Sequence, residues 1–233
     1  MARDFAVIFD MDGVLIDSER HWPPLEAGLM PLLVSDWTAA DQLELVGMSP
    51  HDLFEKLADR PGFSLDKATF LERYVEVGRP IYEERCDLAP GAAALLEATR
   101  AAFVPTALAS SSPRAWIEMA IHRFGLQPLF GAIVSGDDVR RGKPAPDIFL
   151  HVAAREGVEP ASCLVVEDSM PGVQAALNAG MPVVRYVGGS HFGPGRPAAA
   201  DNCPAFDKWP DFFDMIPSLE KETTGSARHG EQG

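Results

Sequence analysis

The sequence predicts an α/β protein, with a doubly wound, Rossmann-like parallel sheet as its core and an all-helical cap domain inserted into it. Three observations favour this class. Short apolar runs typical of buried parallel strands recur, helical patterns separate them, and the strand pattern disappears between about residues 17 and 88. We therefore expect a core of residues 1–16 and 89–217, a cap of residues 17–88, and a disordered tail at 218–233.

Five segments are expected to form the strands of the sheet. The first is the apolar run Phe5–Phe9, which ends at Asp10 and so delivers an acid at the carboxyl end of a strand. The other four are Phe103–Ala109, Ala132–Ser135, Cys163–Val166 and Pro182–Tyr186. Because helical patterns lie between them, these strands are expected to belong to βαβ units and to run parallel.

Two helices of the core carry clear boundary signals. One is expected to have Ser112 as its N-cap, with Pro113 at the first helical position, and to stop at Gly125. The other is expected to be capped by Ser169 and to end at Gly180. The residues expected to face the core from these helices are Trp116, Ala120, Phe124, Val173, Ala176 and Leu177.

The cap is expected to contain helices at Pro50–Asp59 and Leu65–Glu84. Its first helix is harder to place because of Pro23, Pro24 and Pro31. Each proline removes a hydrogen bond or kinks a helix unless it lies in a first turn or a loop. The geometry of that helix is left open by the sequence.

Acidic residues outnumber basic ones. The chain carries 34 Asp and Glu against 20 Lys and Arg, a formal net charge of −14. This charge repels nucleic-acid backbones and anionic membranes, and no run of Lys or Arg offsets it, so we expect neither as a partner. A small anionic ligand would need a metal ion and a few well-placed cations to attract it.

Cysteine usage and the N-terminal sequence favour a reducing, cytoplasmic location. Cys86, Cys163 and Cys203 are odd in number and widely spaced, unlike a disulfide framework or a zinc site, so each is interpreted as a small apolar filler. The N-terminal apolar run is too short for a signal peptide, and no stretch approaches the ~18 apolar residues of a membrane span. We expect a monomer or a weak homodimer.

Polar residues follow the predicted strands at the points where the strands end. Because the strand ends of an open α/β sheet meet in one crevice, these side chains are expected to form a common site. Several carboxylates in one crevice repel one another unless a hard cation lies among them, and such oxygen-rich groups suit Mg²⁺. The candidates are Asp10, Asp12, Ser110, Lys143, Glu167 and Asp168.

Asp10 and Asp12 lie two residues apart at a strand end, so their side chains point the same way, and Gly13 lets the chain turn sharply. A carboxylate can attack phosphorus, and a second acid can protonate the leaving oxygen and then activate water. Ser110 offers a hydroxyl and nearby backbone N–H groups at a helix start, which suit a phosphate. Lys143 offers a positive charge to the nucleophile and to phosphoryl oxygens.

Four segments, taken in order, resemble the motifs of the haloacid dehalogenase superfamily. They are Asp10–Glu19, Ala109–Ser111, Gly142–Asp147 and Glu167–Gly172. The resemblance extends from about Phe5 to Val187 and is strongest to the branch that contains phosphoglycolate phosphatase, sugar phosphatases and β-phosphoglucomutase. That branch has a helical cap inserted after the first motif.

The resemblance implies a role for each matched residue. It implies that Asp10 is the nucleophile and that Asp12 is the general acid and base. Asp12 would also bind the metal through its backbone carbonyl. Ser110 and Lys143 are implied to bind the phosphate, and Glu167 and Asp168 to be Mg²⁺ ligands. Which of the last two contacts the metal directly is left open. Gly13, Ser111 and Glu19 are further candidates for contacting the phosphate or the substrate. The expected activity is hydrolysis of a small phosphorylated sugar, polyol or glycolate-like acid.

Two alternatives stay open: a phosphosugar mutase like β-phosphoglucomutase, and a protein that binds a phosphorylated metabolite without catalysis. The cap histidine of the mutase would align with Trp22 and its phosphate-binding arginine with Pro50, so hydrolysis is favoured. Asp12 argues against a dehalogenase, because halide needs no protonated leaving group. The cap residues considered for selectivity are Glu19, Trp22, Met48, Ser49 and Arg79, although Trp22 and Met48 equally suit the core of the cap.

Overall fold

The computed structural model describes residues 5–45, 48–101, 103–189, 203–209 and 211–212, so the tail predicted at 218–233 lies outside the described residues. The described residues form a six-stranded sheet in the order β3-β2-β1-β4-β5-β6, and every neighbouring pair is parallel. The strands are β1 (Ala6–Phe9), β2 (Thr106–Ser110), β3 (Ile133–Ser135), β4 (Cys163–Glu167), β5 (Val183–Tyr186) and β6 (Ala205–Phe206). The predicted α/β class is confirmed.

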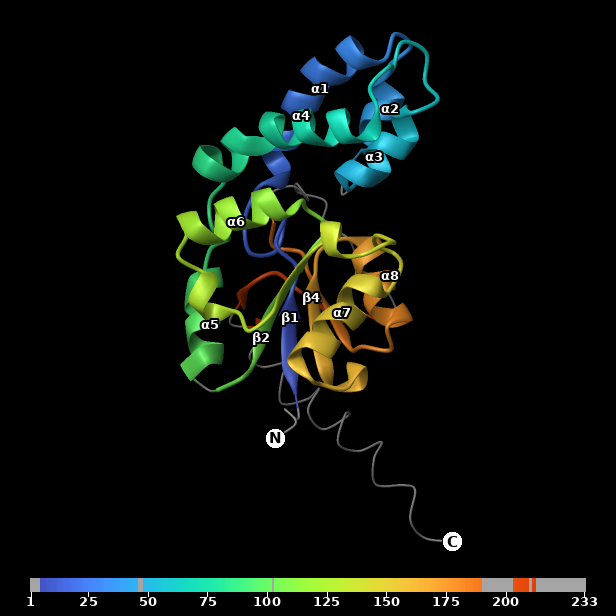
Figure 1. The fold of residues 1–233 in the computed structure, drawn as a ribbon. Coiled ribbons are helices and arrows are strands. Elements are labelled where there is room, and N and C mark those ends of the chain that lie inside the picture. The colour runs from blue at the N-terminus through green and yellow to red at the C-terminus, as the bar shows by residue number, and fades with distance from the viewer. Residues whose placement is uncertain (1–4, 46–47, 102, 190–202, 210, 213–233) are drawn as a thin grey trace, which may run out of the picture.

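Helices cover both faces of the sheet (Figure 1). The core helices are α5 (Ala92–Ala101), α6 (Arg114–Arg123), α7 (Asp147–Glu156) and α8 (Met170–Asn178), with 3₁₀ turns at Gln127–Leu129, Gly136–Asp138 and Pro160–Ser162. Alternate residues of β1 point to opposite faces, as the two-residue period of a strand requires. Val7 and Phe9 join the apolar cluster of α5 and α6, whereas Ala6 and Ile8 join that of α7 and α8.

All five predicted strands are present, with several ends shifted by one residue and two larger differences. The second strand begins at Thr106 instead of Phe103, because Phe103 has a left-handed backbone (φ 57°) and is 92% exposed. A left-handed residue cannot continue a strand. The structure adds β6, which has only two residues and therefore no periodicity that a sequence could display.

Helix boundaries were predicted correctly for α8 and for the C-terminal end of α6, where left-handed Gly125 (φ 66°) follows the C-cap Phe124, but not for the N-terminal end of α6. Ser169 caps α8 by accepting a hydrogen bond from the Gly172 N–H. In α6 the N-cap is Pro113 and not Ser112, because the Ser112 hydroxyl donates to Asp12 in the site described below. Leu177, predicted to face the core, is 42% exposed.

The cap consists of α1 (Trp22–Leu33), α2 (Ala39–Leu43), α3 (Pro50–Leu57) and α4 (Lys67–Pro80), preceded by a 3₁₀ turn at Glu19–His21 and followed by a π-helical turn at Ile81–Arg85. Two prolines of α1, Pro23 and Pro24, lie in its first turn, where no N–H donor is needed, and Pro31 lies in its last turn. Pro23 and Pro24 therefore cost no intrahelical hydrogen bond, whereas Pro31 leaves the Ala27 carbonyl, four residues before it, without its usual helical N–H donor.

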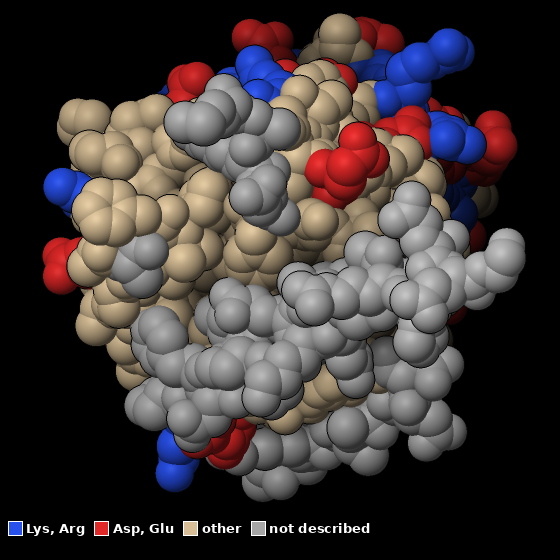
Figure 2. All heavy atoms as spheres, turned by 90° about the horizontal axis from the view of Figure 1, so that it is seen from below, with Lys and Arg blue, Asp and Glu red and all other residues tan. Residues whose placement is uncertain are grey.

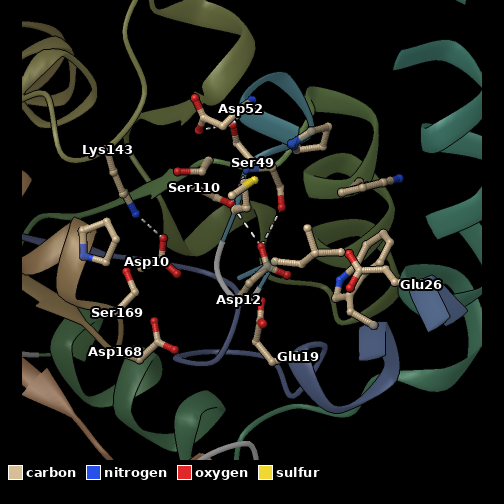
Figure 3. Close-up of a pocket in the computed structure, with 18 of the residues that line it drawn as sticks. Asp10, Asp12, Glu19, Glu26, Ser49, Asp52, Ser110, Lys143, Asp168 and Ser169 are labelled. Atoms are coloured by element: carbon tan, nitrogen blue, oxygen red, sulfur yellow. Dashed lines mark hydrogen bonds and ion pairs between the residues drawn. The ribbon is translucent and has the colours of Figure 1, made fainter. Parts of the chain in front are cut away.

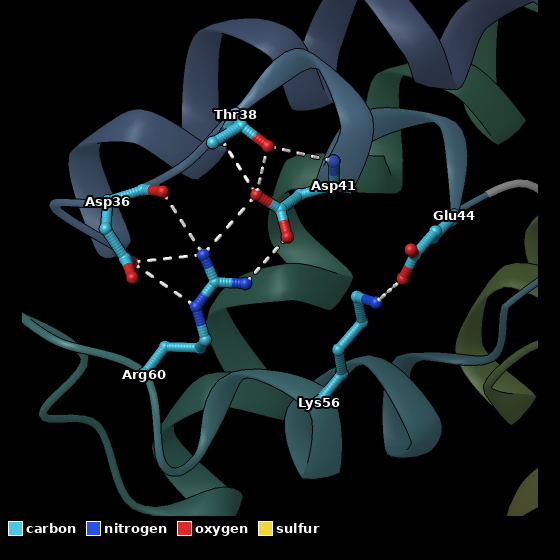
Figure 4. A network of polar contacts seen from close by, with 6 residues as sticks. All are labelled: Asp36, Thr38, Asp41, Glu44, Lys56 and Arg60. Atoms are coloured by element: carbon cyan, nitrogen blue, oxygen red, sulfur yellow. Dashed lines mark hydrogen bonds and ion pairs between the residues drawn. The ribbon is translucent and has the colours of Figure 1, made fainter.

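The chain enters and leaves the cap at one place, directly above the sheet (Figure 1). The Asp17 N–H donates to the Asp87 carbonyl at 2.8 Å, and Ile16 forms an antiparallel bridge with Leu88. Within the cap, Arg60 joins Asp36 and Asp41, and Lys56 pairs with Glu44 (Figure 4). These contacts tie the end of α3 to the segment that carries α2.

The face opposite the cap is mainly uncharged where it is described, and Lys and Arg lie near its edge together with Asp and Glu (Figure 2). Cys86, Cys163 and Cys203 are buried free thiols, as predicted. In the described part of the chain, no helix is both long enough and apolar enough to cross a membrane.

Candidate active site

A cavity of about 550 Å³ lies between the cap and the carboxyl ends of β1, β2 and β4. Figure 3 shows Asp10, Asp12, Ser110, Lys143 and Asp168 around it, each coming from a strand end or the loop that follows it. Glu167 also lines the cavity. The structure therefore brings together side chains from four separate stretches of the chain, as parallel strands that end at one edge of a sheet do.

Lys143 joins two buried carboxylates. Its Nζ donates to Asp10 Oδ1 at 2.5 Å and to Glu167 Oε1 at 2.6 Å. Burial lowers the pKa of Lys143, but the charges of Asp10 and Glu167 outweigh burial and hold this pKa above its ordinary value. Lys143 therefore carries its positive charge at neutral pH and holds the Asp10 carboxylate in a fixed position.

Asp10, Glu167 and Asp168 form a compact acidic group. All three are buried, and each offers an oxygen within 4.8 Å of the others. Burial raises the pKa of Asp10 and of Asp168 well above their ordinary values, and neighbouring carboxylates add to the effect. Three hard oxygen donors that destabilise one another as anions are a suitable donor set for Mg²⁺, so these residues fit the metal that the sequence predicted.

The side chain of Asp12 lies apart from this acidic group and accepts hydrogen bonds from four hydroxyls. Ser18 and Tyr82 donate to Oδ1 at 2.6 and 2.9 Å. Ser112 and Ser110 donate to Oδ2 at 2.7 and 3.2 Å. Two donors come from the segments that join the cap to the core and two from the end of β2, so the position of Asp12 depends on both domains.

The remaining predicted site residues are placed as follows. Ser111 and Glu19 line the cavity. Gly13 does not line it: its N–H donates to the Ile16 carbonyl at 2.8 Å, and its φ of 77° forms the turn after Asp12. Its amide is thus used within the turn.

Residues that the sequence interpretation missed support this site. Arg185 is a charged residue in the buried strand β5, and its Nε donates to the Asp168 carbonyl at 2.8 Å. Ser169 donates to Glu167 Oε2 through its N–H and its hydroxyl, at 2.7 and 3.0 Å. A charged residue within an otherwise apolar strand was the one signal that could have identified Arg185.

Aromatic side chains form the wall of the cavity toward the cap. Trp22 stacks on Tyr74 with ring centroids 5.4 Å apart, and Trp116 stacks on Tyr82 at 5.0 Å. All four rings line the cavity, so Trp22 both packs in the cap and borders the site. Arg79, considered for selectivity, does not line the cavity, because it pairs with Glu76 and Glu83 along its own helix and the turn that follows.

The fold and the site together define a class of protein: an α/β domain in which an inserted helical cap covers a buried carboxylate and lysine site at the carboxyl edge of a parallel sheet. The chain belongs to the haloacid dehalogenase-like hydrolases, whose family model matches residues 6–180. The resemblance drawn from the four motifs is therefore confirmed.

Individual relatives agree with this assignment. Hexitol phosphatase B of Escherichia coli K12 is 32% identical over 179 residues, which cover 76% of this chain and 80% of that protein. The bifunctional riboflavin kinase/FMN phosphatase of Arabidopsis thaliana is 34% identical over 182 residues. These residues cover 76% of this chain but 47% of that protein, so this chain spans about half the length of that relative. A solved haloacid dehalogenase-like protein of unknown function from Agrobacterium tumefaciens is similar at a TM-score of 0.70 and 29% identity, covering 94% of this chain and 100% of that one.

Proposed function

We propose that this chain is a Mg²⁺-dependent phosphatase that hydrolyses a small phosphorylated metabolite through a phosphorylated Asp10. The observation that carries the proposal is the contact of Lys143 Nζ with Asp10 Oδ1 at 2.5 Å, inside a buried group of three carboxylates on the floor of a capped cavity. The relatives named as hexitol phosphatase and FMN phosphatase support phosphate-ester hydrolysis as the reaction.

In the first step, a carboxylate oxygen of Asp10 attacks phosphorus, and the bond from phosphorus to the ester oxygen breaks. Asp12 gives a proton to the departing oxygen, so the alcohol leaves uncharged. The Lys143 ammonium stabilises the negative charge on the transferring oxygens. Asp10, Glu167 and Asp168 would hold Mg²⁺, which would supply further positive charge for the phosphoryl group.

In the second step, Asp12 accepts a proton from water as that water attacks phosphorus, which releases inorganic phosphate and restores Asp10. Ser110 and Ser111 line the cavity, which supports a role for them in holding phosphoryl oxygens through hydroxyl and N–H groups. To reach the ester oxygen, Asp12 must exchange at least one of its four hydroxyl partners for the substrate.

The test is hydrolysis of p-nitrophenyl phosphate with Mg²⁺, with EDTA and with Ca²⁺. We expect turnover with Mg²⁺, none with EDTA, and inhibition by Ca²⁺, which takes more oxygen ligands at longer distances than Mg²⁺ and would therefore compete with phosphorus for the Asp10 carboxylate. Asp10→Asn should abolish turnover, because the amide keeps the shape but is a poor nucleophile.

The matched control is Asp59→Asn, the same change at an exposed carboxylate of the cap, which should leave turnover unchanged. Full activity in EDTA, or more than trace activity of Asp10→Asn, would contradict the proposal.

A further inference from the structure

Glu26 is a buried carboxylate that the reaction described above does not use. It lies on α1 and is 7% exposed, yet it borders the cavity. Figure 3 places Glu26 on the opposite side of the pocket from Lys143, with Asp12 between them. Its carboxylate therefore faces the part of the cavity where the group esterified to the phosphate would lie.

The groups that hold Glu26 are neutral. The Tyr74 hydroxyl donates to Oε1 at 2.8 Å, and Gln42 Nε2 donates to Oε2 at 3.2 Å. An ionised carboxylate has about four acceptor positions, so two such donors leave it able to accept more hydrogen bonds. Glu26 is thus oriented by the cap without being saturated by it.

Gln42 adds a second acceptor at the same place. Its Oε1 is buried and has no hydrogen-bond partner within the described part of the chain. Reversing the amide would turn Oε1 toward the carboxylate and bring two acceptors into contact, so the Glu26 contact fixes the orientation that leaves Oε1 unpaired. A buried acceptor without a donor costs free energy, which a ligand that brings a donor would recover.

The charges around this end of the cavity limit what it can bind. Arg20 is a cation from the cap side that lines the cavity, and it pairs with Asp17 and Asp87. A second anionic group on the substrate would therefore meet the Glu26 carboxylate and two aromatic rings, Trp22 and Tyr74, while the Arg20 guanidinium is already paired with two carboxylates. Hydroxyl groups, in contrast, donate to carboxylate and amide oxygens, and the C–H faces of a carbohydrate pack on aromatic rings.

We propose that Glu26, together with Gln42, selects the leaving group of the substrate: it binds a neutral, hydroxyl-bearing group, as in a polyol or sugar monophosphate, and rejects one that carries a second anion. This inference rests on the proposed phosphatase function and narrows it, because a glycolate-like phosphate becomes a poor substrate. Glu26 contacts the leaving group and not the phosphate, so its effect is on selectivity.

The electrostatics of Glu26 support a role in binding over a role in stability. Burial raises its pKa above the ordinary value of 4.5, and the hydrogen bonds from Tyr74 and Gln42 act in the opposite direction. A carboxyl group whose pKa is raised by folding destabilises the protein above that raised pKa, where its buried form is charged. A neutral side chain of the same shape should therefore raise the melting temperature at neutral or higher pH.

The experiment compares the wild-type enzyme with Glu26→Gln on sorbitol 6-phosphate, 2-phosphoglycolate and p-nitrophenyl phosphate. We expect Glu26→Gln to lower kcat/KM for sorbitol 6-phosphate by about tenfold or more, mainly through KM, because the amide replaces one acceptor oxygen by an NH₂ donor and leaves the other uncharged. Hydrolysis of 2-phosphoglycolate should rise, and that of p-nitrophenyl phosphate should stay within about twofold, since its ring brings no hydroxyl donor. The melting temperature should rise.

Gln42→Met is the second variant, because it keeps the length of the side chain while removing both Oε1 and the Nε2 hydrogen bond that orients Glu26. It should show the same selective loss on sorbitol 6-phosphate. Unchanged polyol kinetics in Glu26→Gln, or an equal loss on the aryl phosphate, would overturn the inference while leaving the phosphatase function in place. Faster turnover of phosphoethanolamine than of sorbitol 6-phosphate would contradict the inference, because it would show that Glu26 selects a cationic group on the substrate and not a hydroxyl group. A wild-type enzyme that hydrolyses none of these esters would overturn both proposals.

Discussion

At the scale of single residues, the site depends on one close approach between a backbone and a side chain. Gly172 lies in the first turn of α8, and a Cβ atom there would lie 1.8 Å from Glu167 Oε1. Glu167 in turn accepts hydrogen bonds from Lys143 and Ser169. Glycine is therefore required at this position by the carboxylate next to it and not by its own backbone angles.

Gly172→Ala should displace Glu167, and with it Lys143 and the acidic group. We expect a loss of p-nitrophenyl phosphate turnover of at least about tenfold and a destabilisation of about 1–3 kcal/mol, as for other insertions of a methyl group into a packed site. Urea unfolding and initial rates measure the two effects.

The control for this change is Gly28→Ala in the exposed middle of α1, where an added Cβ meets nothing within 4 Å. It should stabilise the protein by about 0.5–1 kcal/mol, since alanine is the better helix former, and leave turnover unchanged. A fully active Gly172→Ala enzyme would show that Glu167 tolerates displacement.

The hydrogen-bond partners of Asp12 cannot be predicted from the residues next to it in the sequence. Its position two residues after Asp10 predicts that it reaches the site. The four hydroxyls on its carboxylate come from residues 6 to 100 positions away in the chain. Ser112 was interpreted as a helix cap because an N-cap serine before proline is a common local pattern, and a contact with a carboxylate about a hundred residues away leaves no local signal.

At the scale of secondary-structure elements, the cap is held by polar contacts at the ends of short helices (Figure 4). Asp41 in the first turn of α2 accepts hydrogen bonds from the Thr38 N–H at 2.9 Å and the Thr38 hydroxyl at 2.6 Å. Arg60 Nη1 donates to its other oxygen at 2.7 Å. These bonds lower the pKa of Asp41 below its ordinary value of 3.8, with the Arg60 hydrogen bond as the largest cause.

Asp41→Asn should therefore reduce stability in a pH-dependent way. A carboxyl whose pKa is lowered by folding contributes stability above its ordinary pKa and loses it as the pH falls through the lowered value. The variant should melt below the wild type at neutral pH, and the difference should shrink as the pH is taken below about 3.8. Thermal denaturation at neutral pH and at about pH 3 measures this, with Asp59→Asn as the control. A difference that grows on acidification would show that Asp41 does not stabilise the cap as an anion.

Sequence patterns identified the longer elements better than the short ones. Pro50–Leu57 and Lys67–Pro80 match the predicted cap helices apart from their ends. The second helix begins at Lys67 instead of Leu65, and beyond Pro80 it becomes a π-helical turn. That turn carries Tyr82 to Asp12. A change from an α-helix to a π-helical turn depends on the contacts that the last turn makes. Hydrophobic periodicity over only a few residues does not distinguish the two helix types.

At the scale of the whole molecule, the cap and the core together enclose one cavity. The cavity is enclosed by residues of both domains, and direct contacts between them include His51 Nε2 with Asp137 Oδ1 at 3.1 Å. Pro50 also borders the cavity, so neither Trp22 nor Pro50 brings a charged group to the positions expected for the mutase. Because neither of these two positions supplies a phosphate-binding group, we expect water to be the acceptor.

We expect a polyol or sugar monophosphate to release inorganic phosphate in a one-to-one ratio with the substrate consumed, without a bisphosphate activator. A phosphate balance with Mg²⁺, followed by product analysis, measures this. Asp10→Asn serves as the blank for non-enzymatic release. Conversion of glucose 1-phosphate to glucose 6-phosphate with little free phosphate would contradict hydrolysis and favour the mutase.

The sequence by itself determined the fold class and which segments of the chain form the parallel strands. It also determined which residues lie at the strand ends or in the loops that follow them, such as Asp10 and Lys143. These features follow from local periodicity and from the rule that parallel strands end at one edge of a sheet. The tertiary structure alone decided that Asp12 meets hydroxyls from both domains, that Gly172 must make room for Glu167, and that Glu26 borders the cavity. Such contacts join residues distant in the chain, and their distances are set by packing and not by any pattern in the neighbouring sequence.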